Sequence, residues 1–134
     1  NLCVHLMFGL PGETDQQIRE TAEILSEHKV DGVKLHNLHV LKNTPLEKLY
    51  QESQFVPLEL EEYTRKVCIF LENLSPKIAV HRLAAVASRW EELIAPAWTR
   101  EKMRTTQYID DYLATNNTWQ GRNYLDAETD EQVS

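Results

Sequence analysis

A glycine-rich turn between an apolar run and an amphipathic pattern constrains the fold of this chain most strongly. The apolar run covers residues 2–8, and the turn that follows it reads Gly-Leu-Pro-Gly-Glu-Thr at 9–14. Glycine lets the backbone turn sharply and approach a ligand closely, while proline restricts the turn. Neither the Gly-Lys-Ser/Thr ending of a Walker A loop nor a three-glycine dinucleotide fingerprint is present. The segment therefore predicts a strand, a turn that presents main-chain groups to a flat polar molecule, and a helix.

Hydrophobic periodicity predicts alternating strands and helices over the first 83 residues. The near-continuous apolar run at 2–8 is typical of a parallel strand covered on both faces. Further strands are expected at 33–36 and 78–81. Helices are expected at 14–28, 45–52 and 60–74, the first two opening with the capping boxes Thr14/Gln17 and Thr44/Glu47. Strands separated by helices, with no hairpin signal, predict a parallel α/β sheet.

The C-terminal third has a helical pattern. A turn or short helix is expected around 88–94, and a longer helix from Thr99, as N-cap, to about Ala114. The tryptophans and basic residues of 89–119 either contact RNA or pack the terminal helices against the sheet. The polar and acidic residues 122–134 predict a loose tail. We therefore expect an α/β unit over 1–83, a helical extension over 84–121 and a tail.

Length and charge limit the function. At 134 residues the chain is shorter than the roughly 200 residues of a complete barrel. There is no apolar stretch of about 20 residues and no basic-then-apolar leader, so we expect no membrane partner. Two isolated cysteines fit a reducing compartment, which makes the cytoplasm the expected location. A net charge of -7 argues against indiscriminate nucleic-acid binding.

Several segments, in order along the chain, carry a resemblance to a known family. They are Gly-Leu-Pro-Gly-Glu-Thr at 9–14, Val-Lys-Leu-His-Asn-Leu-His-Val-Leu and the five residues after it at 33–46, Glu-Glu-Tyr at 61–63, Val-His-Arg-Leu at 80–83, Ala-Pro-Ala-Trp at 95–98 and Gln-Gly at 120–121. Together they resemble the C-terminal half of radical S-adenosylmethionine (SAM) proteins of the YhcC/YtqA type, Fe-S oxidoreductases related to the elongator catalytic subunit and coproporphyrinogen dehydrogenase. The resemblance covers residues 1 to about 121. It implies the second half of a partial TIM-type (βα) barrel, with about three parallel strands followed by C-terminal helices.

The resemblance also implies cofactors and a reaction. The family holds a [4Fe-4S] cluster with a CxxxCxxC triad, and only Cys3 and Cys68 occur here, so the cluster ligands lie outside this chain. The intact protein would reductively cleave SAM to a 5'-deoxyadenosyl radical. Modification of tRNA wobble uridines is the leading hypothesis, with tRNA and an electron donor as partners. We expect this chain to be a fragment that is inactive alone and self-associates through the exposed edge of its first strand.

The resemblance assigns the cofactor-binding residues. Parallel strands of a barrel deliver the residues at their C-terminal ends to one mouth. The turn after the first strand would shape the SAM site, and main-chain groups after the second strand would bind the adenine. Glu13 falls one residue later than in the commonest motif, so it either serves this site or only favours the helix dipole. The predicted cofactor-binding residues are Met7, Gly9, Leu10, Pro11, Gly12, Glu13, Leu38 and Val40.

The catalytic candidates are basic side chains at the ends of the second and third strands. By the period of two, Lys34 and His36 face the barrel interior, and a buried lysine is costly unless paired, so Lys34 is either functional or half of an ion pair. His36 and His39 would contact substrate or the SAM ribose. Arg82 would grip a carboxylate or phosphate, or with His81 anchor the C-terminal helices.

Two other classes of protein remain open. In a metal-dependent TIM-type hydrolase, His5, His36, His81 and a carboxylate would be the metal ligands. His5 is otherwise a barrel residue without a ligand role. In a non-catalytic binding module, the barrel face would only dock a partner.

Overall fold

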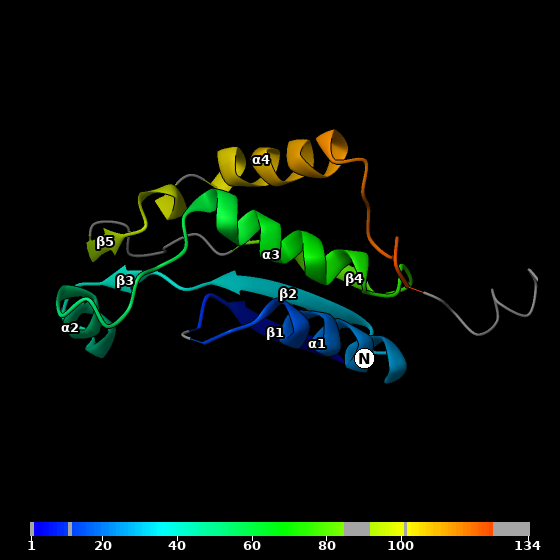
Figure 1. The fold of residues 1–134 in the computed structure, drawn as a ribbon, viewed down its shortest axis with the longest axis horizontal. Helices are drawn as coiled ribbons and strands as arrows, with labels where there is room; N and C mark the ends of the chain where they lie inside the picture. The colour runs from blue at the N-terminus through cyan, green and yellow to red at the C-terminus, as the bar shows by residue number, and fades with distance from the viewer. Residues whose placement is uncertain (1, 11, 85–91, 101, 125–134) are drawn as a thin grey trace, which may run out of the picture.

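A computed structural model describes residues 2–10, 12–84, 92–100 and 102–124. Figure 1 shows the course of the chain. The elements, in order, are β1 (Cys3–Phe8), α1 (Asp15–Glu27), β2 (Gly32–Asn37), β3 (Val40–Leu41), α2 (Pro45–Gln51), α3 (Leu60–Glu72), β4 (Ala79–Arg82), β5 (Leu93–Ala95), the 3-10 helix η2 (Ala97–Arg100) and α4 (Lys102–Thr115). No helix in these described ranges is long and apolar enough to cross a membrane.

Three parallel strands form the main sheet, in the order β1-β2-β4. In the register of β1 against β2, Met7 is the partner of His36. In the register of β2 against β4, Lys34 is the partner of Arg82, after a shift between Val33 and Lys34. The parallel α/β architecture is confirmed. Within the described residues the sheet does not close into a barrel, and β1 lies at its edge.

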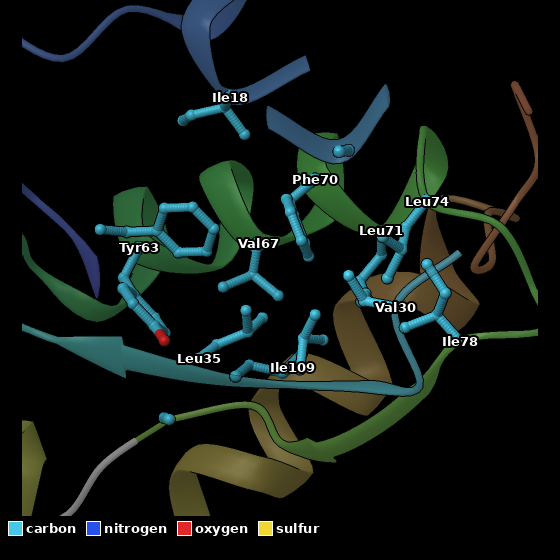
Figure 2. Close-up of a cluster of buried hydrophobic side chains, with 14 residues drawn as sticks. Ile18, Val30, Leu35, Tyr63, Val67, Phe70, Leu71, Leu74, Ile78 and Ile109 are labelled. Carbon is cyan, nitrogen blue, oxygen red and sulfur yellow. The ribbon is translucent and has the colours of Figure 1, made fainter. Parts of the chain in front are cut away.

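One face of the sheet is covered by helices. Val33 and Leu35 of β2 are fully buried in a core that includes Ile18 of α1 and Val67 and Phe70 of α3. Figure 2 shows these helix side chains gathered with Leu35 in the cluster between the helices and β2. Helix α3 packs against α1, and α4 packs beside α3 (Figure 1).

The opposite face of the sheet, which we call the open face, carries the alternate side chains. On β1 these are Cys3, His5 and Met7, all of which are exposed. The expectation that this strand is covered on both faces is therefore wrong. The apolar run at 2–8 misled because Cys3 and Met7 count as apolar, although the period of two places them on the open face.

Local signals explain the helix ends. Thr14 caps α1, with its side chain accepting from Gln17 N and the Gln17 side chain accepting from Thr14 N, as the sequence predicts. At α2 only half of the predicted box forms, because the Glu47 carboxylate accepts from Asn43 N at 2.6 Å and not from Thr44 N.

The C-terminal region differs from the sequence prediction. Leu93–Ala95 forms β5, which pairs antiparallel with β3, and residues 88–91 of the expected turn or short helix lie outside the described residues. The periodicity of a short apolar run fits either a helix or a strand. Here the run forms a strand because it pairs with the distant strand β3. Thr99 is not an N-cap, because it lies in η2 and its hydroxyl donates to Pro96 O.

The residues after α4 return to the end of α3. Gly121 N donates to Leu71 O and Asn123 N donates to Glu72 O, both at 2.8 Å. These bonds satisfy carbonyls that the last turn of a helix leaves free. Trp98 packs against Tyr63 with a centroid separation of 5.3 Å, as the packing alternative predicted.

Candidate functional site

The turn after β1 depends on its two glycines. Gly9 has φ of +105° and Gly12 has φ of +80°, a backbone region that residues with a Cβ rarely adopt. Inside the turn, Gly9 N donates to Glu13 Oε1 at 3.1 Å and Glu13 N donates to Leu10 O at 3.2 Å. Pro11 lies outside the described residues. The turn is thus closed by its own hydrogen bonds.

A nearly buried ion pair fastens this turn to α3. Lys66 Nζ lies 3.2 Å from Glu13 Oε1, and the two side chains are 8% and 12% exposed. Sequence reasoning considered Glu13 only as a SAM-site residue or a helix-dipole carboxylate and missed this partner. The available signal was a lysine directly before Val67, on the buried side of an amphipathic helix.

The loops after β1 and β2 meet at the C-terminal edge of the sheet. A Cβ on Gly9 would lie 3.4 Å from Leu58 Cδ1 and 4.0 Å from Leu38 Cβ. Val40 is fully buried and pairs with Ala95 between β3 and β5. The structure therefore brings the predicted adenine-binding segment next to the glycine turn.

A groove beside the turn and a half-buried histidine complete this edge. The Nδ1 atom of His39 is buried and bonds no described residue, and burial lowers the pKa of His39. The groove is lined by Gly9, Leu10, Gly12, Glu13, Gln54, Phe55, Val56, Leu58, Glu62 and Lys66. At Gly12, one of these lining residues, a Cβ would meet no atom within 4 Å, so the main chain there is open to a ligand.

Basic side chains from all three strands converge on the open face. Arg82 Nη2 donates to His36 Nε2 at 2.6 Å. The rings of His5 and His36 stack with centroids 5.3 Å apart, and His5 Nδ1 lies 3.2 Å from His36 Nε2. Lys34 lies two residues before His36 on the same face, and it forms no ion pair with a described residue. The ion-pair alternative for Lys34 is therefore not observed in this part of the chain.

The surroundings of His36 favour its neutral form. A guanidinium can only donate hydrogen bonds, so the His36 nitrogen that bonds Arg82 must carry a lone pair. Burial lowers the pKa of His36, and the positive charge of Arg82 lowers it further, with smaller effects of His5, Lys34 and His39. His36 is thus an uncharged acceptor inside a basic cluster.

His81 does not join this cluster. Its ring lies against Gly32, where a Cβ would come within 2.7 Å of His81 Cδ2. Gly32 precedes His36 by four residues on β2, a distance of roughly 13 Å along a strand. Of the five predicted catalytic residues, the structure gathers Lys34, His36 and Arg82, keeps His39 at the adjoining edge and places His81 apart.

The histidines and cysteines do not form a metal site in the described structure. No group of three or more His, Cys, Asp or Glu side chains there could hold a metal ion. Cys3 is exposed on β1, and Cys68 is buried in α3, where burial raises its pKa to about 11. These two thiols do not fit an iron-sulfur cluster, which needs several neighbouring thiolates.

Parallel strands whose C-terminal ends carry a glycine turn and a basic cluster define part of an α/β fold with a candidate ligand-binding site at the edge of its sheet. The chain belongs to the radical SAM C-terminal domain family, whose model matches residues 30–115.

Similarity to individual proteins extends beyond residues 30–115 and confirms the predicted relationship to proteins of the YhcC type. The chain is 32% identical over 124 residues to the uncharacterized protein MJ0486 of Methanocaldococcus jannaschii, covering 92% of this chain and 38% of that protein. It is 35% identical over 112 residues to protein YhcC of Escherichia coli, covering 84% of this chain and 36% of that protein. The chain thus spans a little over a third of the length of these curated relatives.

A solved structure shares the fold. The archaeal Elp3 of Methanocaldococcus infernus, with an N-terminal deletion, matches with a TM-score of 0.72 at 16% identity, covering 88% of this chain and 28% of that chain. At this identity the match shows the fold alone.

Proposed function

We propose that the protein containing this chain is a radical SAM enzyme, and that this chain forms part of its SAM pocket and of the wall that faces the substrate. The observation that carries the proposal is the meeting of the glycine turn with the loop after β2, in a chain of this family. SAM bound to a [4Fe-4S] cluster supplies a 5'-deoxyadenosyl radical by reductive cleavage, and the cluster ligands would come from outside this chain.

The residues present fit one side of a SAM site. Gly12 leaves the main chain of the turn approachable, and Met7, 45% exposed on the open face, offers an apolar surface beside it. Leu38 lies next to Gly9, so the main chain after β2 is close enough to bind the same ligand. In this proposal the chain binds and orients SAM, while the basic side chains of β2 and β4 face the substrate.

For the substrate, we propose tRNA, with modification of wobble uridines as the reaction class. The resemblance to the elongator catalytic subunit motivates this choice. The concentration of Lys34, His36 and Arg82 on one face of a chain with net charge -7 agrees with a local site for a nucleic acid.

The test is formation of 5'-deoxyadenosine by the full-length protein, reconstituted anaerobically with iron and sulfide and supplied with SAM and a reductant. We expect product, and more product when bulk tRNA is added. Absence of product from protein with an intact cluster would favour a non-catalytic binding module. Product formation that does not respond to tRNA would support the radical SAM reaction and contradict tRNA as the substrate.

A matched pair of glycine variants tests the role of the turn. Gly12→Ala and Gly121→Ala each place a Cβ at a positive φ, +80° and +87°, but Gly121 packs on the end of α3. We expect Gly12→Ala to weaken SAM binding and Gly121→Ala to leave it unchanged in folded protein. Equal SAM affinity of the two variants would contradict the placement of SAM at this turn.

A further inference from the structure

The basic cluster on the open face has an excess of positive charge that the described chain does not neutralise. Lys34 and Arg82 form no ion pair with a described carboxylate, and Arg82 Nε is buried without a hydrogen-bond partner there. A buried donor without a partner costs free energy, and two adjacent cations repel each other. Such an arrangement is stabilised when an anion binds between the cations.

The strand ends hold these groups in place. Tyr63, buried in α3, donates its hydroxyl to Leu83 O at 2.6 Å, directly after Arg82. The partner of Arg82 in the register is Lys34, yet its guanidinium reaches forward to His36. His5 is likewise the partner of Lys34, and its ring also leans toward His36. The side chains on both sides of Lys34 thus point toward the C-terminal edge of the sheet, where the glycine turn lies.

We propose that Lys34, His36 and Arg82 form an oxyanion-binding site that holds a phosphate or carboxylate group of the substrate. The inference rests on the proposed function, since it assigns the chemistry of the substrate that the open face would contact. Arginine presents planar paired donors that match both oxyanions, and lysine adds a point charge. His36 accepts from Arg82 in the free protein and becomes a donor when it is protonated.

This arrangement makes anion binding depend on pH. The basic groups that face His36 are His5 from β1, Lys34 from its own strand, Arg82 from β4 and His39 from the following loop. The positive charge of these groups disfavours the protonated form of His36, whereas the negative charge of a bound anion favours that form. Binding therefore takes up a proton, and the affinity rises as pH falls.

The experiment is calorimetric titration of the full-length protein, without SAM or reductant, at constant ionic strength. One titration uses sulfate, whose charge is constant between pH 5.5 and 8, and the other uses acetate. Stronger binding of sulfate would assign a phosphate-bearing substrate, and stronger binding of acetate a carboxylate. Failure of both anions to bind would overturn the proposal.

Variants locate the site. We expect Arg82→Gln and Lys34→Gln each to weaken binding of the preferred anion by about tenfold to a hundredfold, the range for a hydrogen bond to a charged group. The matched controls Arg19→Gln and Lys48→Gln alter exposed cations on α1 and α2 and should bind as the wild type does. Unchanged affinity in both Arg82→Gln and Lys34→Gln would refute the assignment.

Two further variants separate binding from folding. Arg82→Lys keeps the charge, so it should recover part of the affinity that Arg82→Gln loses. His36→Asn should abolish the increase in affinity between pH 8 and pH 5.5, whereas a persistent increase would exclude His36 as the titrating group. Because no titration contains SAM, failure of anion binding is independent of 5'-deoxyadenosine formation, which tests the proposed function.

Discussion

The ion pair between Glu13 and Lys66 should control the stability of the turn that shapes the candidate site. Both side chains are nearly buried, and the same oxygen, Glu13 Oε1, also accepts from Gly9 N. The nearby carboxylates of Asp15 and Glu62 are already bound by Arg65, at 2.8 Å and 2.6 Å. Neither is therefore free to replace Glu13 as the partner of the lysine.

The expected magnitudes follow from burial. Removing one partner of a buried pair leaves an uncompensated charge, which costs about 3–5 kcal/mol. We expect about 3 kcal/mol for Glu13→Gln, because glutamine keeps an acceptor for Gly9 N, and about 3 kcal/mol for Lys66→Met. The double variant has no uncompensated charge, so it should lose less than about 3 kcal/mol, far below the sum of about 6 kcal/mol for the two single variants.

Urea unfolding followed by circular dichroism measures the free energy of unfolding of the wild type, the two single variants and the double variant. The control Glu23→Gln changes an exposed carboxylate of α1 and should stay within about 0.5 kcal/mol of the wild type. A double variant whose loss equals the sum of the single losses would show that the two charges are not coupled. The turn would then be held by its own hydrogen bonds alone.

Three further predictions concern other parts of the chain. Gly121→Ala should lower the free energy of unfolding by about 1–2 kcal/mol or more in chemical denaturation, because φ is +87° and a Cβ would lie 2.8 Å from Pro76 Cδ; an unchanged midpoint would show that this turn is not docked on α3. A thiol reagent should label exposed Cys3 quickly and buried Cys68 only as the protein unfolds, and equal rates under native conditions would contradict the burial of Cys68. Because burial lowers the pKa of His36, the unfolded chain binds more protons near pH 6, so stability should fall from pH 7.5 to 5.5 and fall less in His36→Asn; equal slopes would contradict the lowered pKa.

The sequence predicted elements whose signals are local. Thr14 and Gln17 set the start of α1 through a reciprocal cap, and His28 ends the helix as expected. The alternation along β2 also held, with Val33 and Leu35 in the core and Lys34 and His36 on the open face. These features depend on residues within a few positions of one another, so periodicity and capping rules suffice.

Features that depend on distant pairing could not be predicted. The partner of Glu13 is in α3, and the partner of β5 is β3. Neither pairing leaves a periodic trace in the sequence. Lys66 places a charged side chain among the buried residues of α3, which indicates a buried partner without identifying it.

The shape of the basic site depends on an irregularity that the period of two does not reveal. In a regular strand, His81 and Arg82 would face opposite sides of the sheet. The register of β4 against β2 shifts between Val33 and Lys34, and both side chains contact residues of the open face, His81 at Gly32 and Arg82 at His36. An irregular strand re-aims side chains in this way without changing the composition of the segment. The position of Arg82 is therefore a property of the strand pairing, so an insertion or deletion in β4 should disturb the site more than substitution of any one of its residues.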